Sequence, residues 1–350
     1  MEGLRIGIVT SPTPSLAVVA KDLVYTFRRL GKVSDFYDYR IPYYEARDKF
    51  DRAIVVMTFD PLYAPTWFLL ARDYNVNKIP SVVYTTVEGE PKRWLVKYWI
   101  RRDLIFIANS KFTEKMLNRV DIEPVGMIHH GVNFSEIEKA KTQAKKLKQK
   151  LKEELGVKVV FGTVVSGHRR KGLEYFAQAV RTFREKIKDA GFYVLTGREG
   201  ANKLIGLDGV KVSTEFGKLM RDEILALIGS FDFYVQPSLC EGFGLPVLEA
   251  MGLGVPCIHP DYEPLTEFSS NSLNFTVKVV REEYQDLGDG ILYLCHYYEP
   301  NEMAEKMEKA YELYICNRKA YLAKSSQVKR QAKKFDCVKK YEEFLKVWEG

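Results

Sequence analysis

The sequence predicts an α/β protein of two domains, each built on a parallel sheet wrapped by helices. Three observations lead to this prediction. Short β-rich runs alternate with helical patterns along most of the chain, which is typical of parallel sheets. The alternation restarts after residue 156, and the opening strand–loop–helix of each half looks alike. The 350 residues are also too many for one ordinary core. We therefore expect two Rossmann-like, doubly wound domains that face each other across a cleft.

Residues 1–135 are expected to form the N-terminal domain. Strands are predicted from β-rich apolar runs at Leu4–Val9, Ala53–Met57, Ser81–Tyr84, Leu104–Ala108 and Gly126–His129. Helical patterns lie between these runs at Leu16–Leu30, Leu62–Tyr74, Arg93–Arg101 and Lys111–Leu117.

Residues 136–156 interrupt the alternation with polar, Lys-rich sequence, which we interpret as a basic helical connection between the domains. Its cations are Lys139, Lys141, Lys145, Lys146, Lys148, Lys150 and Lys152. A solvated helix face is the favoured explanation, and contact with nucleic acid or anionic lipid is the alternative.

Residues 157–330 are expected to form the C-terminal domain. Its predicted strands are Val157–Val164, Phe192–Leu195, Val210–Val212, Phe231–Val235 and Pro256–His259, with a helix at Leu173–Ile187. From Asn301 onward the pattern is helical. The last helix, in residues 331–350, is expected to pack back on the N-terminal domain.

Composition indicates a globular protein of the cytoplasm. Hydrophobic residues make up 46% and charged residues 28%, and no run of 18 apolar residues suggests a membrane span. The N-terminus does not resemble a signal peptide. The five cysteines are scattered, without metal-ligand or disulfide spacing. A net charge of +7 allows an anionic ligand but does not identify one.

Residues 237–256 carry the most informative pattern of the chain. An apolar strand runs into a glycine-bearing loop, and Pro246 sits where the first turn of a helix should begin. Such a loop directs backbone N–H groups and a helix N-terminus at one spot, which suits a phosphate. Glu241 and Glu249 flank the loop and offer acceptors for sugar hydroxyls. The segment therefore predicts a pocket for a nucleotide-activated sugar.

The segment from Glu241 to Glu249 resembles the Glu-x7-Glu signature of retaining GT-B-fold glycosyltransferases of the family 4 type (glycosyl transferases group 1). The surrounding sequence extends the resemblance. Pro237-Ser238 precedes the signature, Gly254-Val255-Pro256 follows it, and Pro264-Leu265-Thr266-Glu267 is similar to the later Glu-bearing loop. Lys171-Gly172 resembles the diphosphate-binding loop. The resemblance covers most of the second domain and only loosely the first.

This resemblance implies roles for individual residues. Glu241 and Lys171 would be catalytic, the first contacting the donor sugar and the second neutralising the diphosphate. Glu249 would contact the ribose. The other donor-binding residues implied are Phe243, Gly244, Leu245, Arg169, Arg170, Ser166 and Glu267.

Two positions depart from the family pattern. Ser166 stands where an Arg is common, so Arg169 or Arg170 would supply the charge from a shifted position. The first-domain His of the family would fall within residues 84–89, which contain none. Thr86 or Glu88 would stand in for it on the acceptor side.

The resemblance implies a hexosyltransferase that uses a nucleoside-diphosphate sugar, retains configuration and needs no cofactor. The chain lacks an Asp-x-Asp motif, so no metal is expected. Alternatives are a non-catalytic sugar-nucleotide or nucleic-acid-binding protein, or a sugar-nucleotide epimerase of the same fold. The acceptor could be a sugar, a lipid-linked group or a protein.

Residues 92–102 mix aromatic and basic side chains, so peripheral contact with an anionic membrane is one hypothesis. Packing of the aromatic face on the sheet is the slightly favoured alternative. No nucleic-acid partner is expected, because aromatic residues interleave with cations nowhere else in the chain.

Overall fold

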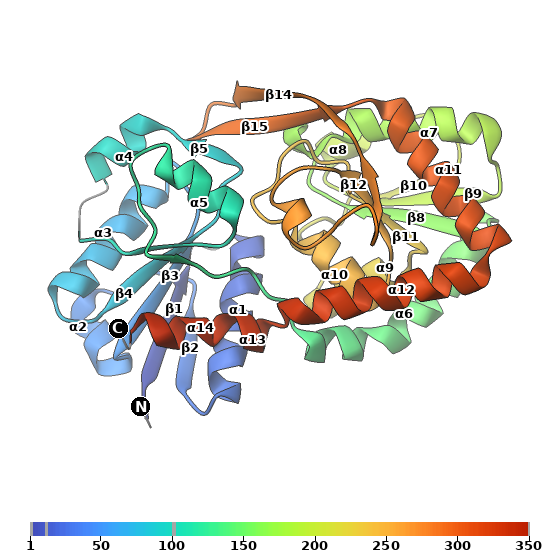
Figure 1. The fold of residues 1–350 in the computed structure, drawn as a ribbon. Coiled ribbons are helices and arrows are strands. Elements are labelled where there is room, and N and C mark those ends of the chain that lie inside the picture. Colours follow the sequence, from blue (N-terminus) through green and yellow to red (C-terminus); the bar gives the residue numbers. More distant parts are fainter. Residues whose placement is uncertain (1–2, 11–12, 100–102, 349–350) are drawn as a thin grey trace.

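The computed structural model describes residues 3–10, 13–99 and 103–348. In this part of the chain two six-stranded parallel sheets, each wrapped by helices, lie beside one another (Figure 1). The predicted α/β class with two Rossmann-like domains is therefore confirmed.

The first sheet has the strand order β2-β1-β3-β4-β6-β7. Its strands are β1 (Arg5–Thr10), β2 (Val33–Tyr37), β3 (Arg52–Met57), β4 (Ser81–Thr85), β6 (Phe106–Ala108) and β7 (Gly126–Met127). The helices of this domain are α1 (Pro14–Arg29), α2 (Tyr43–Lys49), α3 (Ala64–Val76), α4 (Arg93–Trp99) and α5 (Lys111–Asn118). Strand β2 and helix α2 are additions to the sequence prediction.

The second sheet has the strand order β10-β9-β8-β11-β12-β13. Its strands are β8 (Val159–Val164), β9 (Ala190–Leu195), β10 (Val210–Ser213), β11 (Phe233–Val235), β12 (Cys257–Pro260) and β13 (Phe275–Val277). The short 3-10 helices η1 (Arg169–Lys171) and η2 (Leu265–Glu267) and the helices α7 (Leu173–Lys186), α8 (Arg198–Asn202), α9 (Arg221–Ser230) and α10 (Leu245–Leu253) connect them. The order reverses between β8 and β11, and the carboxyl ends of strands at such a reversal are where ligands bind in open α/β sheets.

The basic connection is one long helix, α6 (Phe134–Leu155), which begins at the capping side chain of Asn133. Several of its lysines pair with carboxylates. Lys148 and Lys152 lie 3.2 and 2.9 Å from the buried carboxylate of Asp232, and Lys150 lies 3.7 Å from Glu154. These pairs favour a structural and solvated role for the helix over a nucleic-acid contact.

A β-hairpin from the second domain reaches the first. Strands β14 (Val279–Asp286) and β15 (Ile291–Tyr298) pair antiparallel, and β15 continues the pairing onto β5 (Gly89–Pro91) of the N-terminal domain. Figure 1 shows this three-stranded sheet spanning both domains along the top of the molecule. The sequence analysis did not predict it.

The C-terminal helices return the chain to the first domain. Helices α11 (Pro300–Cys316) and α12 (Arg318–Ala332) cover the second domain, and η3 (Lys333–Phe335), α13 (Cys337–Tyr341) and α14 (Glu343–Val347) follow. Tyr341 and Phe344 are buried in the same apolar cluster as Leu23 of α1. At the crossing, Val132 and Asp336 form a parallel β-bridge, so the two passages of chain between the domains run side by side.

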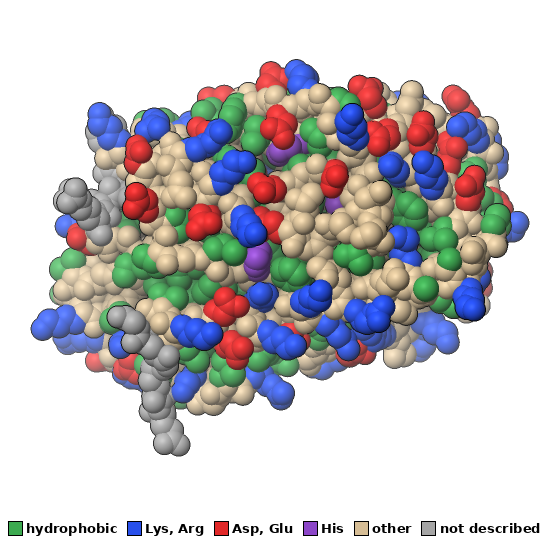
Figure 2. Space-filling model, in the orientation of Figure 1, with side chains coloured by type: hydrophobic (Ala, Val, Ile, Leu, Met, Phe, Trp, Pro, Cys, Tyr) green, Lys and Arg blue, Asp and Glu red, His purple; other side chains and the backbone are tan. Residues whose placement is uncertain are grey.

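The surface of the molecule carries both charge signs. Figure 2 shows acidic and basic side chains interspersed over one face, with basic groups in a row over α12. No helix within the described ranges is both long and apolar enough to cross a bilayer. In α4, Leu95 is fully buried while the Trp94 side chain is 48% exposed. Residues 100–102 lie outside the described part of the chain, so membrane contact through residues 92–102 stays a prediction.

Candidate active site

The predicted site lies at the reversal of the second sheet. Loop 165–172 follows β8, and loop 236–244 follows β11, so both sit at the carboxyl ends of neighbouring parallel strands. The Leu239 amide donates to the Arg170 carbonyl at 2.8 Å and ties the two loops together. Two segments about seventy residues apart in sequence thus form one surface.

The catalytic pair predicted from the sequence is in direct contact. Lys171 Nζ donates to Glu241 Oε1 at 2.6 Å, and both side chains are largely buried. Gln236 Nε2 donates to the same oxygen at 2.6 Å. Burial opposes ionisation of Glu241, but Lys171 and Arg170 outweigh it and hold the pKa of Glu241 below its usual value. An anionic carboxylate therefore faces a cationic loop at neutral pH.

Arg170 is a buried cation with spare hydrogen-bonding capacity. Its Nη2 lies 2.9 Å from Glu88 Oε1, and its guanidinium stacks over the Tyr293 ring at 5.5 Å. Its Nε and Nη1 atoms are buried and have no hydrogen-bond partner within the described residues. Burial works against its charge, but Glu88, together with Glu241 and other nearby groups, more than compensates and raises the pKa of Arg170, so the guanidinium stays charged. Unpaired buried donors of this kind are costly and mark a place for an acceptor.

The N-terminus of α10 completes the cationic surface. Gly244 caps it with φ +92°, a left-handed conformation that glycine adopts without strain, and an added Cβ would overlap Leu265. The next amide, that of Leu245, opens the helix, where the first N–H groups have no partner in the helix itself. Phe243 anchors the loop, because its buried ring packs against the rings of His130 and Phe268, with ring centroids 5.2 and 5.3 Å apart.

The first domain closes over this loop with residues 86–88 and the start of α5. Asn109 Nδ2 donates to Thr86 Oγ1 at 3.0 Å and to the Gly242 carbonyl at 3.3 Å. Ser110 Oγ approaches the same carbonyl at 3.4 Å. Thr86 and Glu88, the residues expected on the acceptor side, therefore both touch the predicted donor loops.

Glu249 belongs to a second charge cluster, centred on Arg221. Arg221 Nη2 donates to Glu249 Oε1 at 2.5 Å, and Arg221 Nε also lies 3.4 Å from Glu136. Asp22 of the first domain joins this group and accepts from Asn133 at 3.1 Å. Burial raises the pKa of Asp22 to about 7, and the nearby Arg221 only partly offsets it.

Glu267, which the sequence predicts as a donor contact, is engaged by groups of the first domain. Its two carboxylate oxygens accept from the backbone N–H groups of Lys111 and Phe112, at 3.0 and 3.1 Å. His129 Nε2 lies 2.8 Å from the same carboxylate. Glu267 thus caps the N-terminus of α5 across the domain boundary, an arrangement that favours an anion.

The remaining predicted donor residues lie on the β8–η1 loop. Arg169 is exposed and Ser166 is partly exposed. Sequence reasoning missed Gln236, Tyr293 and Arg221, which hold Glu241, Arg170 and Glu249 respectively. A polar residue at the end of an apolar strand was the available signal for Gln236. Nothing local marked Tyr293, because the hairpin that carries it was not predicted.

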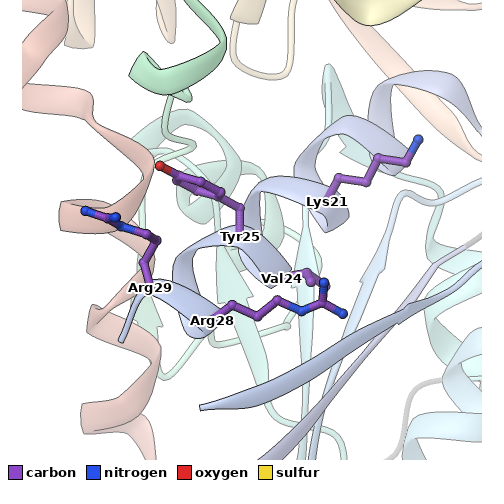
Figure 3. Close-up of a pocket in the computed structure, with 5 residues that line it drawn as sticks. All are labelled: Lys21, Val24, Tyr25, Arg28 and Arg29. Carbon is purple, nitrogen blue, oxygen red and sulfur yellow. The ribbon is translucent and has the colours of Figure 1, made fainter. Parts of the chain in front are cut away.

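Two further observations concern possible metal ligands and a second cavity. Within the residues described, no cluster of three or more His, Cys, Asp or Glu side chains is arranged to hold a metal ion. A cavity of about 340 Å³ lies along the outer face of α1, lined by Lys21, Val24, Tyr25, Arg28 and Arg29 (Figure 3). Its lining includes none of the predicted site residues, so it is separate from the site.

The two facing α/β domains and the cationic loops at the carboxyl ends of β8 and β11 define the GT-B class of fold. Within that class, residues 143–314 match the family model of glycosyl transferases group 1. Over 347 residues the chain is 29% identical to "uncharacterized glycosyltransferase 335" of Sulfolobus islandicus rod-shaped virus 1, covering 98% of this chain and 100% of the viral protein.

Solved structures share the fold over the whole chain. The Anabaena protein HepE, crystallised with UDP and glucose, superposes with a TM-score of 0.73 at 13% identity over 99% of both chains. A glycosyltransferase from Rickettsia africae superposes with a TM-score of 0.71 at 13% identity, covering 100% of this chain and 98% of its own. At this identity the likeness concerns the fold.

Proposed function

We propose that this protein transfers a hexose from a nucleoside-diphosphate sugar to an acceptor with retention of configuration. One observation carries the proposal. At the sheet reversal, Arg170 presents buried donors that have no partner among the described residues. Its neighbour Lys171 pairs with Glu241, on the loop that leads into the N-terminus of α10. Three sources of positive potential converge there, which suits a diphosphate. The crystal of HepE with UDP and glucose supports the same class of ligand.

The chemistry follows from the leaving group. When the sugar departs from the diphosphate, negative charge grows on a phosphate oxygen. Lys171, Arg170 and the amides at Gly244 and Leu245 would stabilise that charge in the transition state without reorganising. Arg169, exposed on the same loop, would add charge at the rim, and Ser166 a hydroxyl. These groups supply the cationic field themselves, so we propose that no metal is required.

The two acids of the signature would bind hydroxyls. Glu241, kept anionic by Lys171 and Arg170, would accept from the donor sugar. Glu249, oriented by Arg221, would accept from the ribose. Glu267 is left out of this set, because its oxygens are engaged by α5.

The acceptor would enter from the first domain, where Thr86 and Glu88 face the donor loops. The acceptor would be a sugar, a lipid-linked group or a protein.

The first prediction tests donor binding and transfer together. A thermal-shift screen of the protein against UDP, GDP, ADP and their hexose conjugates, with and without EDTA, is expected to show stabilisation by one base series that EDTA does not remove. With the stabilising donor, Lys171→Ala and Glu241→Ala are each expected to lower the rate of sugar transfer at least 100-fold, as typical for loss of one transition-state contact.

The matched controls are Lys218→Ala and Glu215→Ala, an exposed acid–base pair on the same domain. They should leave transfer unchanged. Full activity of the Lys171→Ala and Glu241→Ala proteins would refute the assigned roles. Tight donor binding without any transfer or hydrolysis would instead support a non-catalytic sugar-nucleotide binder.

A further inference from the structure

Glu88 reaches from the first domain into the cationic loop of the second. Its carboxylate lies 2.9 Å from Arg170 Nη2, and both side chains are only 17% exposed. Its own backbone is held in place, since the Leu294 amide of β15 donates to the Glu88 carbonyl at 3.1 Å. The ion pair is therefore a partly desolvated contact between domains, and such pairs are sensitive to any competing charge.

Arg170 holds Glu88 with only part of its guanidinium. A guanidinium carries five N–H donors in a planar fork, and those on Nε and Nη1 have no partner in the described part of the chain. The fork binds phosphate in a bidentate manner. A diphosphate on Nε and Nη1 would bring its negative charges close to the Glu88 carboxylate, which lies on the neighbouring nitrogen. In a site of low exposure the two anions would repel each other strongly.

Lys171 and Glu241 form a similar pair, but both belong to the second domain. Glu88 differs because it comes from the other domain, on the segment that also touches Gly242 through Thr86. A ligand that takes Arg170 away from Glu88 would therefore break a contact between the two domains.

We propose that Glu88 pairs with Arg170 Nη2 in the empty protein and is displaced by charge repulsion when the donor's diphosphate binds the Nε and Nη1 donors. This inference rests on the proposed function. Glu88 then competes with the donor's diphosphate for the positive charge of Arg170.

The test measures affinity for a nucleoside diphosphate by calorimetry, using whichever of UDP, GDP and ADP stabilises the protein most. Glu88→Gln keeps the shape of the side chain but removes the competing charge. It is expected to bind the diphosphate about tenfold more tightly than the unmodified protein, equivalent to ~1.4 kcal/mol. A residue that merely supported Arg170 would have the opposite effect, and its loss would weaken binding.

Two controls isolate the contact. Glu90→Gln removes a carboxylate two residues along the chain that pairs with Arg119 instead, and should leave the affinity unchanged. In an Arg170→Gln background, the gain from Glu88→Gln should disappear, because the competition runs through Arg170. A gain that persists there would mean a general field effect and would overturn the proposal, as would equal or weaker binding by Glu88→Gln. Absence of binding to any of the three diphosphates would refute the proposed function itself.

Discussion

Asp22 is a buried acid that makes the protein's stability depend on pH. Burial raises its folded pKa to about 7 from an ordinary value of 3.8. Between these values the folded protein binds a proton that the unfolded chain has released. Stability is therefore lost as pH rises from about 4 to about 7, and the cost stays constant above that window.

The second prediction follows at this scale. Asp22→Asn removes the ionisable group, so the variant should gain free energy of unfolding at pH 8, on the order of 3 kcal/mol, and little at pH 4. Denaturant titrations at both values measure the difference. Asp73→Asn, at an exposed acid of the same domain, should show no such dependence. An equal effect at both values would mean that Asp22 is ionised throughout.

At the scale of elements, the three-stranded sheet across the domains depends on Gly89. A Cβ at this position would overlap the Leu292 carbonyl and lie 2.7 Å from the Leu294 amide, so β5 can approach β15 only with glycine here. Gly89→Ala is predicted to separate these strands at a cost of about 1–3 kcal/mol. Amide exchange should then accelerate in residues 89–91 and 291–294 and not elsewhere in the sheets.

Gly126→Ala is the matched control, because that strand glycine has no neighbour within 4 Å of an added Cβ. Its exchange pattern and stability should stay close to those of the unmodified protein. Unchanged protection of β5 and β15 in the Gly89→Ala protein would show that the pairing tolerates a side chain.

The sequence predicted a strand or helix correctly where its apolar residues follow the pattern of burial in the fold. Strands β3 and β8 are mostly apolar because both faces of a parallel sheet are covered. Strand β14, with the sequence Val-Val-Arg-Glu-Glu-Tyr-Gln-Asp, is mostly exposed and resembles a loop. Its pairing, and that of β15 with β5 some two hundred residues away, leaves no local pattern. The Lys171–Glu241 contact was predictable because both loops end neighbouring strands, whereas the engagement of Glu267 by α5 depends on how the domains meet.

At the scale of the whole molecule, the C-terminal segment couples the unfolding of the two domains, because it leaves the second domain and packs on the first. Tyr341 is fully buried, accepts from the Gly131 amide at 3.1 Å and packs edge-on against Tyr84. Tyr341→Ala is predicted to cost about 3–5 kcal/mol. The lost free energy of unfolding should concern mainly the first domain. Calorimetry should then show the first domain unfolding at a lower temperature than the second, as a separate transition.

Tyr44→Ala serves as the control, since the Tyr44 side chain is 56% exposed. It should leave the calorimetric profile unchanged. A single, sharp transition for Tyr341→Ala at the original temperature would show that the segment contributes little to the first domain.

The paired passages at Val132 and Asp336 restrict how the protein can move. A single connecting strand would allow one half to swivel in any direction, but two strands bridged side by side resist twisting and bend most easily about one line. The hairpin is anchored on the opposite side of the molecule (Figure 1). A wide separation of the two domains would have to break the pairing of β15 with β5. Ligands should therefore enter and leave the space between the domains mainly on the sides that lie between the hairpin and the Val132–Asp336 bridge.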